Sequence, residues 1–268
     1  MRAVMMTIKD FLAKLHTFRN ANILRDWTVD KLYSGDENRI LHKVAITMFP
    51  TLEVMHKAVQ WGAELLVGHE AALGNDQEKP THTVYLAKKQ FLEDSGLAYF
   101  RYHDHPHFMP LDLIGEGTIR FLGLKGKIIG KPYWGITSFQ LHAAMTVRDI
   151  ASIIKMSLPA PHIRIAGAID AAVQNLAFAC GTPGHIYDIL NQDDTDVVIT
   201  GEICEYGEAE LVREMAYQGS KKAILVLGHC ASERSGMRLL AELLPEDFPE
   251  LSFRYIECDD VYHSLMTR

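Results

Sequence analysis

Residues 196–244 read DVVITGEICEYGEAELVREMAYQGSKKAILVLGHCASERSGMRLLAELL, and their apolar pattern points to one class of fold. Two short runs rich in Val, Ile and Leu, 196–200 and 223–227, have the length of buried strands. Apolar residues recur at helical spacing over 205–218 and 233–244. The stretch therefore predicts strand, helix, strand, helix, and parallel strands need crossover helices of this kind.

The same alternation continues through most of the chain, which favours an α/β fold with a largely parallel sheet. A basic, glycine-bearing joint, GLKGKIIGKP at 123–132, predicts a boundary between two lobes. We place the first lobe at 1–124 plus 222–268 and the second at 125–221. Further strands are expected at 44–48, 63–67, 97–102, 163–169, 175–179 and 251–257, and further helices at 51–61, 81–94, 111–122, 147–156 and 184–190.

Composition excludes several classes of protein. The 268 residues are 48% apolar, which is enough to bury a core. A net charge of −7 argues against nucleic acid or an anionic membrane surface as a partner. No apolar run approaches the roughly 18 residues of a membrane-spanning helix, and the N-terminus lacks a secretory signal pattern. Four cysteines without a CxxC pair predict neither a disulfide framework nor a zinc ribbon, so we expect a soluble cytoplasmic protein.

Histidine is unusually frequent, with 13 residues, and three segments place it where a predicted strand ends. His69 and His229 follow apolar runs in the similar sequences LLVGH and VLGH, and HDHPH at 103–107 follows a third run. Ligands of open α/β sheets bind at the carboxyl ends of strands. Imidazole and carboxylate groups suit Zn, Fe, Mn, Co or Ni ions. We therefore expect a metal site, with alternate His side chains of an extended 103–107 segment pointing the same way.

Each histidine segment also has a purely structural interpretation, because a lone His is usually packed or at the surface and His-rich loops can be solvated. Placement of three segments at strand ends favours metal binding. Cys230 is interpreted as a small buried residue, and Ser232 as a helix N-cap rather than a nucleophile. The turn CGTPG at 180–184 lacks the spacing of a phosphate-binding loop. The histidines interpreted as structural are His16, His42, His56, His82, His142, His162 and His263.

Residues 196–244 closely resemble the C-terminal signature of the YbgI/NIF-three family of dinuclear metal-centre proteins. KVAITMFPTLEVMHKAVQWGAELLVGHE at 43–70 resembles the family's N-terminal strand-helix-strand, and CGTPGH its glycine-rich turn. The resemblance implies two similar α/β lobes of mixed or parallel sheet flanked by helices, with two metal ions in the cleft between them. It also implies a homohexamer, and members carry the name GTP cyclohydrolase 1 type 2. The signature residues are Thr200, Gly201, Glu202, Gly228, His229, Glu233, Arg234 and Gly236.

Carried over position by position, the family's metal ligands fall on His69, Glu70, His103, His107, His229 and Glu233. Glu70 stands where the family has His, and His107 stands where it has Asp, so the set keeps its charge and its number of ligands. We expect both positions still to bind metal, with carboxylate and imidazole exchanged. The competing interpretation is a degenerate site that holds one ion or none.

Two functions from different classes follow. The first is metal-dependent hydrolysis of a small substrate, nucleotide-like by resemblance, in which a pair of divalent ions activates water. Glu202, just after its strand, would be the catalytic proton acceptor or a partner of a metal ligand. The second is a non-catalytic metal-binding scaffold or regulatory interaction protein, whose metal site would be closed by protein groups rather than open to water.

Overall fold

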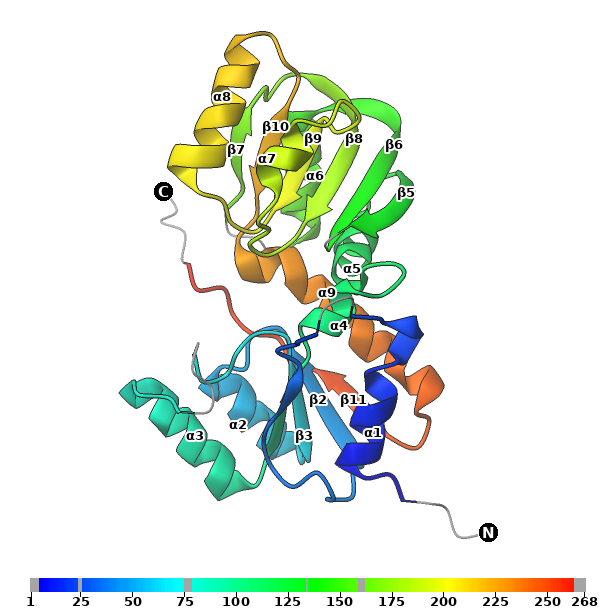
Figure 1. Ribbon diagram of the computed structural model, residues 1–268, viewed down its shortest axis with the longest axis vertical. Coiled ribbons are helices and arrows are strands. Elements are labelled where there is room, and N and C mark those ends of the chain that lie inside the picture. The colour runs from blue at the N-terminus through cyan, green and yellow to red at the C-terminus, as the bar shows by residue number, and fades with distance from the viewer. Residues whose placement is uncertain (1–4, 24–25, 75–78, 134, 159–161, 263–268) are drawn as a thin grey trace. The chain divides into compact units, whose positions relative to one another are not determined.

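The computed structural model describes residues 5–23, 26–74, 79–133, 135–158 and 162–262. The chain divides into two compact units, each with its own sheet. The first unit holds Met1–Pro110 and Met237–Asp259, and the second holds Leu111–Gly236 and Asp260–Arg268. The longer segment of the second unit is thus inserted in the sequence of the first, and its shorter segment follows the first unit. Figure 1 labels the helices and strands of both.

The strands of the first unit are β1 Lys31–Ser34, β2 Lys43–Thr47, β3 Leu65–Gly68, β4 Ala98–Arg101 and β11 Ser252–Tyr255. They form one sheet in the order β1-β4-β3-β2-β11. All neighbours are parallel except β1, which pairs antiparallel with β4. The inner strands β2 and β3 are almost wholly buried, as expected of parallel strands covered on both faces.

The helices of the first unit are α1 Ile8–Leu15, α2 Leu52–Trp61, α3 Thr83–Ser95 and α4 Asp104–His107, with a 3-10 turn at Phe18–Asn20. In Figure 1, α2 and α3 lie on one side of the sheet and α1 on the other. α1 begins with a capping box, in which Thr7 and Asp10 each accept the other's backbone N–H. Its apolar face packs inward, where Phe11 meets Phe248 edge to face at a ring-centroid distance of 4.9 Å.

The strands of the second unit are β5 Gly126–Tyr133, β6 Ile136–Thr146, β7 Arg164–Gly167, β8 Ala172–Ala179, β9 Val197–Thr200 and β10 Ala223–Val226. Their order is β5-β6-β8-β9-β10-β7. β8, β9 and β10 are parallel, and the other pairs are antiparallel. The central strand β9 is buried along its whole length, so side chains from both of its faces lie in a core.

The helices of the second unit are α5 Leu113–Leu122, α6 Val147–Ser157, α7 Ile186–Leu190, a π-helical turn Glu205–Ala209, α8 Glu210–Tyr217 and the first part of α9 His229–Asp247. α7 and α8 pack on one face of the sheet, where Ile189 and Val212 join a core with Val198. α5 and the start of α9 touch through glycines, because a Cβ on Gly117 would lie 2.5 Å from the Cα atom of Gly236. This close approach explains why a glycine stands at each position.

The predicted α/β class is confirmed, since both units are mixed sheets flanked by helices. The segment 123–132, predicted to be a boundary between lobes, is mostly strand β5, which pairs with β6. Its Lys and Gly residues concealed the strand. The predicted lobes, 1–124 plus 222–268 and 125–221, also differ from the units. β10 pairs with β9 and β7, so residues 222–236 belong to the second unit.

All four cysteines are free, as the sequence predicted. Within the described part of the chain, every helix is too short or too polar to cross a membrane.

Candidate metal centre

Two neighbouring parallel strands of the first unit carry histidines beyond their carboxyl ends. β3 ends at Gly68, directly before His69, and β4 ends at Arg101, two residues before His103. The backbone N–H of His69 donates to the Thr47 carbonyl at 3.2 Å, which holds this residue against the end of the sheet. The structure therefore places both histidines at strand ends, where the sequence predicted them.

The segment 103–107 is helical and not extended as predicted, because residues Asp104–His107 form α4. Residues four apart lie on one face of a helical turn, so His103 and His107 share a face. His105 turns away from them. Its Nδ1 lies 2.6 Å from the Asp30 carboxylate, and its ring stacks on His16 at a centroid distance of 4.7 Å. His105 is therefore not part of the set that the extended conformation implied.

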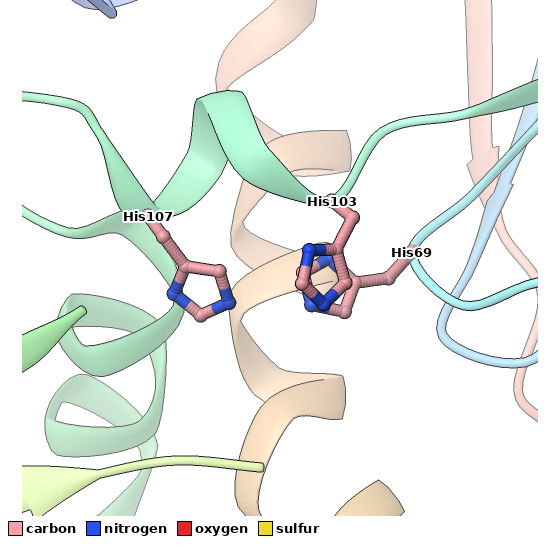
Figure 2. A group of neighbouring side chains, drawn as sticks. All are labelled: His69, His103 and His107. Carbon is pink, nitrogen blue, oxygen red and sulfur yellow. The ribbon is translucent and has the colours of Figure 1, made fainter. Parts of the chain in front are cut away.

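His69, His103 and His107 bring their rings together, as Figure 2 shows. Each offers one ring nitrogen, and the three nitrogens lie within 4.8 Å of one another. The ring centroids are 4.5 Å apart for His69 and His103, and 5.3 and 5.4 Å from each of these to His107. Three imidazoles so close together are able to ligate a single transition-metal ion.

Hydrogen bonds determine which nitrogen carries the proton in two of these rings. Nδ1 of His69 lies 3.1 Å from the Tyr102 carbonyl oxygen, which can only accept a hydrogen bond. Nδ1 of His103 lies 3.0 Å from one carboxylate oxygen of Asp104, whose other oxygen accepts from the Thr28 hydroxyl at 2.8 Å. Both Nδ1 atoms are thus donors, and both Nε2 atoms carry the lone pair. Metal-binding histidines have this arrangement, so the donor set fits a metal ion.

The carboxylate of Asp30 stabilises the turn that carries His103 and His107. This buried carboxylate accepts the backbone N–H groups of His103, Asp104 and His105 at 2.8 to 2.9 Å. Burial alone would raise the pKa of Asp30, but hydrogen bonds from the His105 ring and these N–H groups outweigh burial and lower the pKa. The carboxylate is therefore charged, and it stabilises the first turn of α4 from a distant part of the sequence.

Glu70 lies beside the three histidines. Its Oε2 is 3.1 Å from the Arg101 guanidinium, and its Oε1 is 3.7 Å from Nε2 of His103. The Tyr99 hydroxyl donates to the Glu70 carbonyl at 2.7 Å, which fixes the backbone at this point. One carboxylate oxygen therefore contacts a cation while the other faces a candidate ligand. Its predicted role as a ligand stays a prediction.

The second unit repeats this plan at the ends of its three parallel strands. Thr182, Glu202 and His229 follow β8, β9 and β10 respectively. Nδ1 of His229 lies 3.2 Å from the Thr182 hydroxyl and 3.2 Å from a Glu202 carboxylate oxygen. The same hydroxyl lies 3.2 Å from the other oxygen of Glu202. Thr182 and Glu202 together hold the imidazole of His229 on its Nδ1 side.

Glu233 lies one helical turn after His229 in α9 and faces the other side of its ring. Oε2 of Glu233 is 3.2 Å from Nε2 of His229, and the side chain is buried. Gly181 makes room for it: its φ is +71°, and a Cβ there would lie 2.4 Å from Oε1 of Glu233. A carboxylate and an imidazole at this distance form a second candidate pair of metal ligands.

Ser232 is not the helix N-cap that the sequence predicted, because α9 begins at His229. Its hydroxyl donates to the His229 carbonyl at 2.8 Å and accepts the Gly181 N–H at 3.0 Å. Ser232 therefore ties the glycine-rich turn to the first turn of α9.

The predicted site residues lie in two groups, one in each unit. Metal ligation by them, and their predicted meeting in a cleft between lobes, stay predictions. The sequence did not reveal the residues that orient these side chains. Among the missed residues, only Asp104 could have been suggested by the sequence, because it directly follows His103. The first unit holds His69, Glu70, His103 and His107, and the second holds Glu202, His229 and Glu233; the residues missed are Asp30, Arg101, Asp104 and Thr182.

Fold and side chains together define an α/β protein of two mixed sheets with candidate metal ligands at strand ends in both units. The family model Duf34/NIF3 (NGG1p interacting factor 3) matches residues 6–260, and the chain belongs to this family.

Relatives and solved structures are similar over nearly the whole chain. A GTP cyclohydrolase 1 type 2 homolog of Chlamydia pneumoniae is 24% identical over 255 residues, which cover 91% of this chain and 95% of the relative. A GTP cyclohydrolase 1 type 2 homolog of Clostridium perfringens is 24% identical over 235 residues, which cover 85% of this chain and 87% of the relative. The crystal structure of Staphylococcus aureus protein SA1388 has a TM-score of 0.83 at 16% identity, covering 98% of this chain and 100% of that one. The predicted family resemblance is therefore confirmed.

Proposed function

We propose that the protein is a metal-dependent hydrolase of the NIF-three type that acts on a small, nucleotide-like substrate. The set of His69, His103 and His107 carries this proposal. Three protein ligands are typical of catalytic zinc sites, in which the fourth position is kept for water, whereas structural sites are closed by four protein groups. A divalent ion held there would supply Lewis acidity and lower the pKa of a water molecule toward neutrality.

The surrounding residues would orient the ligands and handle protons. Asp104 and the Tyr102 carbonyl hold two imidazoles with Nε2 as the lone-pair donor. Glu202 contacts His229 and is 53% exposed, so it combines a bond to a candidate ligand with access to solvent. That combination suits a group that accepts a proton and releases it to water. We assign Glu202 this role.

The substrate class is proposed from the names of the relatives, and the assembly from the family resemblance. Two of them are named GTP cyclohydrolase 1 type 2 homolog, which supports a nucleotide-like substrate. We further propose that the chain binds about two divalent ions, drawn from Zn, Fe, Mn, Co and Ni, because nitrogen and oxygen donors suit all of these. The predicted homohexamer and cytoplasmic location belong to the same proposal.

Metal content per chain is the first test, measured on protein purified without a His tag, with the mass of the oligomer recorded in the same run. About two ions per chain would support the proposal. One ion or none, after Zn, Mn, Fe or Co has been supplied, would support the degenerate site instead.

Hydrolysis of nucleotides and phosphoesters is then assayed with His107→Ala as the test variant. His42→Ala is the matched control, because the side chain of His42 is 66% exposed and lies outside the candidate ligands. Turnover that His107→Ala abolishes and His42→Ala keeps would establish a metal-dependent enzyme. Full metal content without turnover of any substrate would favour the non-catalytic scaffold.

A further inference from the structure

A cavity of 360 Å³ lies in the second unit, where β10 ends beside the first residue of β7. This volume is within the range of small-molecule sites, which are mostly apolar with a few polar groups. All of its lining residues lie in the second unit, and the candidate metal ligands are not among them. The lining residues are His162, Arg164, Val226, Leu227, Gly228, Asp260 and Tyr262.

One part of the cavity is apolar. Val226 and Leu227 are buried residues of the β10 end, and Gly228 adds backbone without a side chain. Tyr262 lines the same cavity and remains 69% exposed. An aromatic ligand would cover this phenol ring and gain both apolar burial and ring stacking. The apolar lining therefore suits a ring.

The polar part of the cavity suits an anion. Arg164 and His162 are its nitrogen-bearing side chains, and a guanidinium matches the geometry of a carboxylate or phosphate group. Arg164 forms an ion pair with Glu205, but both side chains are more than half exposed. Such exposed pairs contribute little, so a ligand anion can replace Glu205 at small cost.

The carboxylate of Asp260, which also lines the cavity, is compatible with a bound anion. Its Oδ2 lies 3.4 Å from the buried guanidinium of Arg234, and its Oδ1 accepts the Tyr262 N–H at 3.1 Å. The carboxylate is therefore balanced by a cation, and it anchors the segment that carries Tyr262.

We propose that this cavity binds a small aromatic ligand that carries an anionic group, with its ring against Tyr262 and residues Val226–Gly228 and its anion on Arg164. The site stands apart from the proposed metal function, although Gly228 directly precedes His229 in the chain.

Phenyl phosphate is the probe, titrated by calorimetry into the protein as purified and again in the presence of a chelator. Inorganic phosphate and phenol, titrated alongside, separate the two parts of the ligand. We expect phenyl phosphate to bind at least about tenfold more tightly than either, because only it combines the ion pair with ring burial. Equal binding of inorganic phosphate would overturn the aromatic assignment. Binding that the chelator abolishes would place the anion on a metal and overturn the site.

Substitutions of Arg164 and Tyr262 test which side chains contact phenyl phosphate. Arg164→Gln and Tyr262→Ala should each weaken phenyl phosphate binding by about tenfold. Arg148→Gln is the matched control for the first, since Arg148 is equally exposed and pairs with Asp170. Tyr217→Ala controls for the second, because Tyr217 is exposed elsewhere in the same unit. Weakening by both controls as much as by both test variants would refute the proposed site.

Discussion

The carboxylate of Asp104 lies 3.0 Å from Nδ1 of His103, its neighbour in sequence, and is itself held by the Thr28 hydroxyl. Asp104→Asn keeps the shape of the side chain but removes the charge that favours Nδ1–H on His103. We expect Zn affinity to fall about 10- to 100-fold, as for other partners of metal-bound histidines. Competition with a chromophoric chelator measures this. Asp188→Asn is the control, since Asp188 approaches the exposed His185 at 3.7 Å. Equal losses in the two variants would contradict a specific role for Asp104.

Glu70 distinguishes an exchanged-ligand site from a degenerate one. If carboxylate and imidazole have changed places between Glu70 and His107, then Glu70→Ala should remove an ion. Elemental analysis of the purified variant gives the ratio of metal to protein. Glu53→Ala, which breaks an exposed pair with Lys57, should change nothing. An unchanged metal ratio in Glu70→Ala would show that the carboxylate only pairs with Arg101.

Asp30 should make stability depend on pH in a defined window. Asp30→Asn removes a charged acceptor of three backbone N–H groups, so we expect the free energy of unfolding at pH 7 to fall by about 2 kcal/mol. Because the pKa of Asp30 is lowered in the folded state, its contribution is fully present above the ordinary value of 3.8 and is lost as pH falls through the folded pKa. The difference between wild type and variant, from urea unfolding at several pH values, should shrink below pH 3.8. A difference that widened on acidification would contradict this.

Gly181 and Gly219 offer a matched pair of substitutions. Both have positive φ, but a Cβ on Gly181 would lie 2.4 Å from Glu233, whereas a Cβ on Gly219 would meet nothing within 4 Å. Gly219→Ala should cost about 1–2 kcal/mol from backbone strain alone. Gly181→Ala should cost more and also lower metal content, because it displaces the Glu233 carboxylate. Thermal unfolding and metal analysis report the two effects. Equal behaviour of the two variants would mean that Glu233 moves aside freely.

The sequence predicted those elements whose own residues specify them. Buried strands such as β3 and β10 are continuous apolar runs, and α2 has helical periodicity with a Thr51 cap and Gly62 at its end. The strand pair β5 and β6 was missed, because Lys and Gly interrupt β5. Local pattern is a weak guide to strands at a sheet edge, where β5 lies.

The candidate site divides in the same way. His69 and His229 were found because a strand end is visible in sequence. Helix α4 was not predicted, because a four-residue helix is too short to show a periodic pattern. It also depends on Asp30, which is 73 residues from His103 in the sequence. The Asp30 carboxylate reaches this turn only when the chain folds. The helical turn that it stabilises places His103 and His107 on one face and directs His105 away from them.

The insertion of residues Leu111–Gly236 between two parts of the first unit has a consequence for synthesis. β11, which completes the first sheet by pairing with β2, follows this inserted stretch in the chain. On the ribosome, residues Leu111–Gly236 emerge before Ser252–Tyr255 do. The nascent protein therefore can form the sheet of its second unit, whose strands end with β10, while β2 still presents an open sheet edge, the kind of surface that invites pairing with other chains. Of the two sheets, that of the first unit is thus the last to be completed.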